Sequence, residues 1–191
     1  MSKMTTLTKT AKLFSRIVKS VAPPPKITVS EWADMYRKLS PENSAEPGQW
    51  RTDRAPYQRE IMDAVTDPQV EKIVVMTSSQ VGKSEILNNI IGYYIDVDPA
   101  PILLVQPTIE ITQDYSKRRI TPMVKDTKVL SAKVADSKTR DLNNTILMKV
   151  FPGGFLAMGG ANSPTGLASR PIRILLCDEV DRYPSSAGGE G

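Results

Sequence analysis

Two short groups of residues have the types and spacing that phosphate-transfer chemistry needs. Two adjacent carboxylates, Asp178 and Glu179, follow an apolar run late in the chain. Earlier lies a loop of small and polar residues that ends in glycine, lysine and serine: Thr77-Ser78-Ser79-Gln80-Val81-Gly82-Lys83-Ser84. In this order the two groups predict a site that binds ATP with Mg²⁺ and hydrolyses it.

The loop has a physical rationale if it opens a helix. A helix N-terminus offers unpaired N–H groups and the positive end of its dipole to an anion. Gly82 lets the backbone approach phosphate oxygens, Lys83 can reach the β- and γ-phosphates, and the Ser84 hydroxyl can ligate Mg²⁺. The usual pattern begins with glycine where this chain has Thr77. An ordinary strand-to-helix turn with an exposed lysine is therefore the alternative.

The carboxylate pair suits the other half of such a site. Carboxyl ends of parallel strands line the ligand crevice of an α/β sheet. There Asp178 would hold Mg²⁺, directly or through water, and Glu179 would polarise the attacking water. A solvated strand end is the alternative, but the loop and the pair support each other. The preceding Cys177 is interpreted as a small core residue.

These residues need strands and helices to position them. Alternating strands and helices predict a three-layer α/β domain with a mostly parallel sheet. Ser30 is predicted to cap a first helix, and Pro56 to start a second. Further helices are predicted over residues 85–94 and from 109 to 117 or beyond, strands over 72–77, 101–105 and 172–177, and a hairpin over 145–151 and 155–158.

Composition limits the classes of function. The 191 residues suit one domain with short appendages. No run reaches the roughly 18–20 apolar residues of a membrane span, and the N-terminus does not resemble a secretory signal. A single cysteine cannot form an internal disulfide, which fits a reducing compartment. The absence of histidine excludes a histidine-dependent triad and a histidine-ligated zinc site.

The net charge of +4 is unevenly distributed. Residues 1–30 hold six basic and no acidic residues, and residues 117–140 hold eight basic residues against Asp126 and Asp136. Polyanion contact is expected at these two places, with a solvated helix face as the alternative for the second. Residues 1–22 predict a weak basic amphipathic helix, which could dock a partner, touch DNA, lie on a membrane or remain a solvated tail.

Several motifs in series resemble the large subunit of tailed-phage terminases, in the lambda-like branch. The resemblance covers about residues 27–184. It is carried by Pro56-Tyr57-Gln58, by Ser79-Gln80-Val81-Gly82-Lys83-Ser84, by Gln106-Pro107-Thr108, by Asn162-Ser163-Pro164-Thr165-Gly166-Leu167-Ala168-Ser169-Arg170-Pro171 and by Cys177-Asp178-Glu179-Val180-Asp181. It implies a three-layer P-loop NTPase fold of the ASCE, helicase-like class, truncated at its C-terminal side. It also implies an ATP-driven motor that threads double-stranded DNA into a procapsid.

The resemblance also assigns roles to residues. Gln58 would contact adenine and Tyr57 would stack on the base, with simple helix-start chemistry as the alternative. Many terminases carry an arginine in the phosphate loop where this chain has Ser79. Arg170 is then the candidate arginine finger, acting in its own chain or on a neighbouring subunit, and a loop salt bridge is its alternative.

The implied organisation is a basic arm and proline-rich spacer (1–26), a motor domain that could be incomplete (27–184) and a tail (185–191). The arm, within residues 1–25, would engage the small terminase subunit. The motor would form a homo-oligomer at the portal of the procapsid, in the bacterial cytoplasm and without a membrane. No cluster of acids predicts a nuclease site in this chain.

Two other functions compete with this one. A helicase-like nucleic-acid translocase of cellular origin would share most of these motifs. A non-catalytic DNA- or protein-binding module would keep only the fold. The intact Lys83, Ser84, Asp178 and Glu179 argue against the second alternative, because a relic is expected to lose at least one of them.

Overall fold

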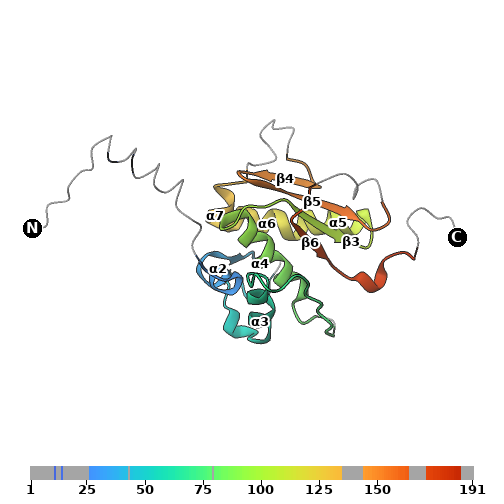
Figure 1. Ribbon diagram of the computed structural model, residues 1–191, viewed down its shortest axis with the longest axis horizontal. Helices are drawn as coiled ribbons and strands as arrows, with labels where there is room; N and C mark the ends of the chain where they lie inside the picture. The colour runs from blue at the N-terminus through green and yellow to red at the C-terminus, as the bar shows by residue number, and fades with distance from the viewer. Residues whose placement is uncertain are drawn as a thin grey trace, which may run out of the picture.

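A computed structural model describes residues 11, 14, 26–42, 44–78, 80–134, 144–163 and 171–185 (Figure 1). Most of the predicted basic arm, Ser79, Arg170 and the tail from residue 186 lie outside these residues.

Four strands form one sheet in the order β4-β5-β3-β6. Strands β5, β3 and β6 are parallel, while β4 pairs with β5 as an antiparallel hairpin. Ile102 of β3 stands opposite Leu156 of β5 and Ile174 of β6. The predicted hairpin and the predicted strands over residues 101–105 and 172–177 are therefore confirmed. The strands are β3 (Ile102–Gln106), β4 (Met148–Phe151), β5 (Gly154–Gly160) and β6 (Ile174–Cys177).

The strand predicted over residues 72–77 is wrong. Residues 71–78 form no strand, and Val74 and Met76 expose 70% and 91% of their surface. An apolar, β-branched run becomes a strand only when neighbouring strands pair with its backbone and cover its side chains. Within the described residues no strand does so for this run.

The helix α2 (Val29–Tyr36) begins two residues earlier than a Ser30 cap implies. Its N-cap is Thr28, whose hydroxyl accepts from the Glu31 N–H while the Glu31 carboxylate accepts from the Thr28 N–H. This reciprocal capping box satisfies two backbone donors, which a Ser30 cap would not. The prediction for Ser30 is wrong for that reason, and its side chain is buried instead.

The remaining N-terminal elements agree better with the sequence. Helix α3 (Tyr57–Ala64) starts after Pro56, as predicted, and buries Met62. Helix α4 extends the predicted helix by two residues at each end, from Lys83 to Asp96. A two-stranded ribbon and a short 3-10 turn connect α2 to α3: β1 (Lys38–Leu39), β2 (Gly48–Gln49) and η1 (Thr52–Arg54).

A long helical segment follows β3. Helix α5 (Ile109–Tyr115) passes into a π-helical turn, η2 (Ser116–Ile120), and then into α6 (Thr121–Asp126). Helical backbone angles at both junctions make it continuous. Two short elements complete the fold: α7 (Lys128–Ser131) and the 3-10 turn η3 (Val180–Arg182).

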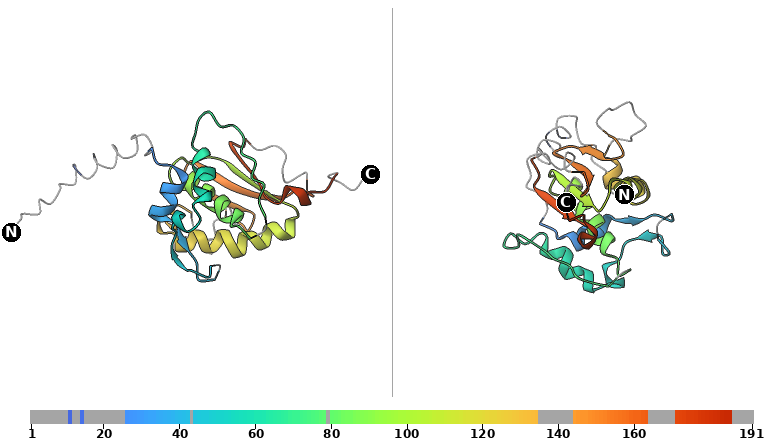
Figure 2. Two further views of the ribbon diagram at one scale, coloured as in Figure 1. Left: turned by 90° about the horizontal axis from the view of Figure 1, so that it is seen from below. Right: turned by 90° about the vertical axis from the view of Figure 1, so that its right-hand side faces the viewer.

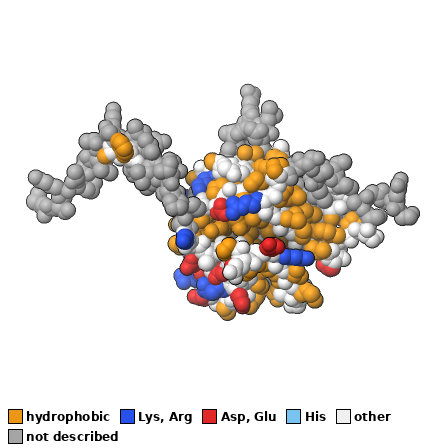
Figure 3. Space-filling model, in the orientation of Figure 1, with side chains coloured by type: hydrophobic (Ala, Val, Ile, Leu, Met, Phe, Trp, Pro, Cys, Tyr) orange, Lys and Arg blue, Asp and Glu red, His pale blue; other side chains and the backbone are white. Residues whose placement is uncertain are grey.

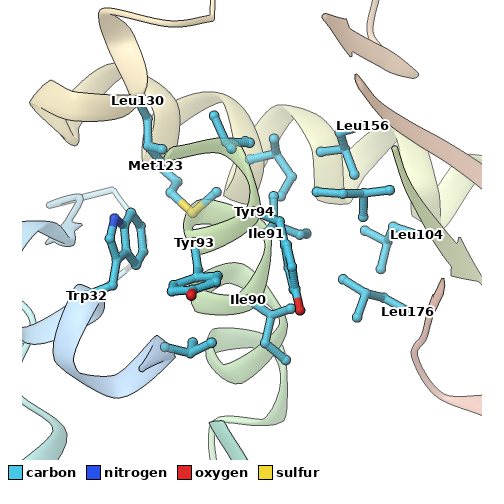
Figure 4. Close-up of a cluster of buried hydrophobic side chains, with 14 of the residues drawn as sticks. Trp32, Ile90, Ile91, Tyr93, Tyr94, Leu104, Met123, Leu130, Leu156 and Leu176 are labelled. Carbon is cyan, nitrogen blue, oxygen red and sulfur yellow. The ribbon is translucent and has the colours of Figure 1, made fainter. Parts of the chain in front are cut away.

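Helix α4 lies at the centre of the hydrophobic core (Figure 4). One side of α4 packs on Leu104, Leu156 and Leu176 of the sheet, and its other side faces Trp32 of α2. Trp32 fits because Gly92 has no side chain, since a Cβ there would overlap the indole ring. Figures 1 and 2 show α2 and α3 on the side of α4 that faces away from the sheet.

The second face of the sheet carries a smaller cluster. Leu103, Val105 and Ala157 pack there with neighbours of which none belongs to a helix: Met148, Phe155, Ala161, Ile172 and Tyr183. Among the described residues, helices thus cover one face of the sheet, and the fold is a mixed α/β fold. The helix layer expected on the second face remains a prediction.

Candidate nucleotide site

The candidate site lies at the carboxyl ends of the parallel strands. Helix α4 ends at Asp96 and β3 starts at Ile102, so a short connection makes α4 run back along the sheet. This antiparallel course brings the N-terminus of α4 to the strand ends at which Gln106 and Asp178 lie. Such an edge is where open α/β sheets bind their ligands.

The phosphate-loop candidate has a special backbone. Gly82 takes φ +82°, and Gln80 also has a positive φ of 62°. The positive φ of Gly82 favours glycine, and a Cβ there would lie 2.5 Å from Nε2 of Gln58 and displace that amide. Lys83 and Ser84 follow as the first residues of α4, where helix N–H groups have no intrahelical acceptor.

Tyr57 and Gln58, the residues predicted to bind adenine, lie against this loop. The Tyr57 hydroxyl donates to the Val81 carbonyl oxygen at 2.9 Å, and the Gln58 amide donates to the same oxygen at 3.0 Å. Oε1 of Gln58 is buried without a hydrogen-bond partner among the described residues. A buried acceptor without a donor is costly, and a ligand amine would satisfy it.

Tyr115 ties the first turn of α4 to α5. Its hydroxyl donates to the Ser84 carbonyl oxygen at 3.2 Å and to Oδ1 of Asn88 at 2.8 Å. Glu85, in the same turn, forms ion pairs with Arg37 at 3.0 Å and with Arg119 at 3.5 Å. Burial lowers the pKa of Arg37 from its ordinary value, and the Glu85 carboxylate opposes this shift.

Asp178 is buried beside the same network. Its backbone N–H donates to the Val105 carbonyl oxygen at 3.0 Å, and its Oδ2 accepts from Nε2 of Gln106 at 3.1 Å. Burial raises the pKa of Tyr115 well above its ordinary value, and the carboxylates of Glu85 and Asp178 raise it further. The hydroxyl that contacts Ser84 thus lies within the electrostatic reach of Asp178.

Glu179 points elsewhere in this structure. It has a left-handed backbone (φ 50°, ψ 47°), and its carboxylate forms an ion pair with Arg182 at 3.0 Å. A non-glycine residue in this conformation is strained, which is common at functional sites. A role for Glu179 toward water requires release from Arg182. Cys177 beside it is exposed, so its assignment to the core is wrong, because β6 buries Leu176 and turns its neighbours outward at the sheet edge.

Sequence reasoning missed Tyr115 and named Gln106 only as part of a motif, without a role in the site. Their partners Ser84 and Asp178 are 31 and 72 residues away in the chain, and no local pattern encodes such contacts. Gln106 did carry a signal, because it is a polar residue that ends an apolar strand, as Asp178 does. No such signal marks Tyr115.

The second basic cluster is partly neutralised within the described residues. Arg118 pairs with Asp114, Arg119 with Glu85, and Lys133 with Asp96. Three lysines are exposed and have no ion pair with any residue that the structure describes: Lys117, Lys125 and Lys128. On the face drawn in Figure 3, hydrophobic side chains gather over the sheet and charged ones of both signs lie over α2 and α3.

Other kinds of site find less support in the part of the chain that the structure describes. No three His, Cys, Asp or Glu side chains converge there in a way that could hold a metal ion. A metal beside Asp178 would thus need the Ser84 hydroxyl and ligand oxygens to complete its coordination. In the same part of the chain, every helix is too short or too polar to cross a bilayer.

Comparison with known proteins identifies the group to which these features belong. Residues 44–191 match the family described as phage terminase large subunit gpA, ATPase domain. The terminase large subunit of Escherichia phage lambda is 30% identical over 176 residues, which are 91% of this chain and 27% of that protein. That of Enterobacteria phage P21 is 25% identical over 170 residues, 88% of this chain and 26% of that protein. This chain spans about a quarter of the length of these relatives, and no solved structure matches it significantly.

Proposed function

Because the chain belongs to the ATPase-domain family of phage terminase large subunits, we propose that it binds ATP with Mg²⁺ at the N-terminus of α4 and hydrolyses it. The ATP would drive packaging of double-stranded viral DNA. For the fold we propose the three-layer ASCE P-loop class.

One observation carries this proposal. Tyr115 hydrogen-bonds to the carbonyl oxygen of Ser84, the residue that follows Lys83 in the loop. The charge of Asp178, at the end of β6, helps to raise the pKa of Tyr115. Two segments that are far apart in sequence, each with a specific role in phosphate chemistry, thus act on one buried side chain, one through a hydrogen bond and the other through its charge.

Each residue then has a task. Lys83 and the free N–H groups of α4 bind the phosphates, with the loop residues Ser78, Ser79, Gln80, Val81 and Gly82 as the cradle. Ser84 and Asp178 hold Mg²⁺, which when bound neutralises charge on the phosphates. Glu179 leaves Arg182 to orient the attacking water. Arg170 supplies the arginine finger that stabilises the charge of the transferring phosphoryl group.

The base-binding part uses Gln58 and Tyr57. The unpartnered Oε1 of Gln58 is suited to accept from the exocyclic amine of adenine. Tyr57 is 56% exposed beside the loop, so a base could stack on its ring. This pair gives the site a preference for adenine over guanine.

The wider assembly follows from the family. The lysines of the second basic cluster would bind double-stranded DNA, and residues 1–25 would bind the small terminase subunit. A homo-oligomer of the full-length motor would bind the portal of the procapsid. The site of action is the cytoplasm of the bacterial host.

Nucleotide binding tests the proposal directly. A fluorescent ATP analogue is titrated into the chain and into Lys83→Ala, with Lys125→Ala as the matched loss of a lysine on an exposed helix face. We expect Lys83→Ala to weaken binding by roughly 10-fold or more, as removal of a charge-assisted contact does, and Lys125→Ala to leave binding unchanged. Equal affinity of all three proteins would overturn the phosphate-loop assignment.

A further inference from the structure

Gln106 is the last residue of β3, and the proposed site gives it no task. Its side chain is 2% exposed, which is unusual for an amide at the end of a strand. In the parallel register Val105 stands opposite Cys177, so the next residues along, Gln106 and Asp178, are neighbours across the two strands. Both follow buried leucines, Leu104 and Leu176, by two residues and so project on the face that α4 covers.

The interaction between the two side chains has a fixed direction. An ionised carboxylate only accepts hydrogen bonds, so the amide of Gln106 must present its N–H to Oδ2 of Asp178, at 3.1 Å. The backbone N–H of Asp178 is held by Val105, and the Tyr183 hydroxyl donates to that same Val105 oxygen at 2.8 Å. The main chain and one carboxylate oxygen of Asp178 are thus both fixed, while no group among the described residues donates to the other oxygen.

We propose that Gln106 is the positioning residue for the metal-binding carboxylate. By holding Oδ2, it leaves Oδ1 of Asp178 available to the metal, for which Ser84 supplies the other protein ligand. A partner of this kind fixes the orientation of a metal ligand and contributes to metal affinity. The inference rests on the proposed function, because it needs Asp178 to bind Mg²⁺.

The test measures how much Mg²⁺ improves nucleotide binding. The affinity for a fluorescent ATP analogue is determined with Mg²⁺ and with a chelator, and the Mg²⁺ concentration giving half of the gain is recorded. Gln106→Met keeps the length of the side chain and removes the donor. Thr112→Val is the matched control, because the Thr112 hydroxyl also makes a buried hydrogen bond at this edge, to the Gly159 carbonyl, without touching Asp178.

We expect Gln106→Met to raise the half-saturating Mg²⁺ concentration by about 10- to 100-fold, the usual effect of losing such a partner. Affinity in chelator should stay within about 2-fold of the unchanged chain, and Thr112→Val should leave both quantities unchanged. If Gln106→Met does not fold, Gln106→Asn, whose amide falls one methylene short, replaces it with the same expectation. A Mg²⁺ dependence that matches that of Thr112→Val overturns the role of Gln106.

Asp178→Asn separates this inference from the function on which it rests. If Asp178→Asn abolishes the Mg²⁺ gain while Gln106→Met leaves it intact, only the positioning role fails. If Asp178→Asn itself keeps the full gain, the metal assignment fails, and the role of Gln106 fails with it.

Discussion

The hydroxyl of Tyr115 lies 3.2 Å from the carbonyl oxygen of Ser84, and this hydrogen bond joins α5 to the first turn of α4. The same hydroxyl reaches Asn88 one turn further along, so Tyr115 clamps the segment that follows the phosphate loop. Its partners are backbone and amide groups, which cannot move away without exposing buried polar atoms. Tyr115 therefore helps to fix the position of the loop relative to the sheet.

Removing this hydroxyl should cost both stability and affinity. Tyr115→Phe leaves buried acceptors on Ser84 and Asn88, and we expect the free energy of unfolding in urea to fall by about 1–3 kcal/mol. Nucleotide affinity should fall as well, because the first turn of α4 loses its anchor. Tyr36→Phe, at an exposed position, is the control and should change neither. Unaltered unfolding of Tyr115→Phe would contradict the clamp.

Substitution of Gly82 should be harmful both because of its positive φ and because a Cβ there would meet Gln58. Gly48 has only the positive φ, so comparing the two glycines separates these effects. Gly48 also has a positive φ, of 121°, but a Cβ there meets nothing within 4 Å, whereas at Gly82 it meets Gln58. Alanine at either position should destabilise the fold by about 1 kcal/mol or more through backbone strain. Only Gly82→Ala should also weaken nucleotide binding. Equal nucleotide affinity of the two variants would show that the fit at Gly82 is unimportant.

Loss of the Glu85 ion pair should lower the free energy of unfolding far more than loss of a surface ion pair. The Arg37 side chain is 4% exposed, so Glu85→Ala leaves a buried cation with only the weaker partners around it. We expect a loss of about 3–5 kcal/mol, the usual cost of breaking a buried pair. Glu46→Ala breaks the exposed pair with Arg54 and should cost less than about 1 kcal/mol. Thermal or urea unfolding of the two variants decides this, and similar losses would refute it.

Stability should fall in alkaline solution through the buried tyrosines. Burial raises the pKa of Tyr115, and also those of Tyr93 and Tyr94, above the ordinary value of 10.0. Below that value both the folded and the unfolded chain keep these protons, so the contribution is fully present. As pH rises above about 10, the unfolded chain ionises first and stability is lost. The urea concentration at the midpoint of unfolding, measured at pH 8, 10 and 11, should fall less for Tyr115→Phe than for the unchanged chain. Equal falls in the two proteins would contradict the assignment of the alkaline loss of stability to Tyr115.

The unpaired lysines of the second basic cluster should carry the electrostatic part of DNA binding. Replacing Lys117, Lys125 and Lys128 together by alanine should lower the salt dependence of binding to a DNA duplex. The slope of log K against log salt concentration should fall by up to about 0.9 for each phosphate that a lysine no longer neutralises. The paired Lys133 offers the comparison, because Asp96 already neutralises it. If Lys133→Ala lowers the slope as much as each of the three, the assignment to unpaired lysines is wrong.

The sequence was informative wherever local patterns decide structure. The apolar runs of β3 and β6, the hairpin around Pro152 and helix α4 follow from periodicity and turn residues, although only β3 is buried along its whole length. Residues 72–77 show the limit of this reasoning, because a strand needs partners that the run itself does not contain. Thr28 replaces Ser30 as a cap for a related reason, since only Thr28 stands three residues before Glu31.

The candidate site was predictable only in part. The loop glycine, Gly82, and the carboxylates at the strand end, Asp178 and Glu179, are recognisable because their chemistry demands those residue types. Tyr57 and Gln58 were found by the resemblance to terminases. Whether Gly82, Lys83, Ser84 and Asp178 bind nucleotide and metal stays a prediction. The supports of the site, Tyr115 and Gln106, depend on side-chain packing between distant segments, which no single-sequence pattern contains.

The π-helical turn at residues 116–120 has a consequence for insertions and deletions. A π turn accommodates one residue more than an α turn, so it sets the rotation of α6 relative to α5. Deletion of a single residue there should regularise the hydrogen bonds and leave the downstream residues near their present face, because the π turn already absorbs the extra residue. Deletion of a residue from α6 before Lys125 should instead rotate Lys125 and Lys128 by about 100° relative to Tyr115 while the clamp on Ser84 stays in place. The helix can therefore lose a residue at the π turn but not in α6 without moving the lysines.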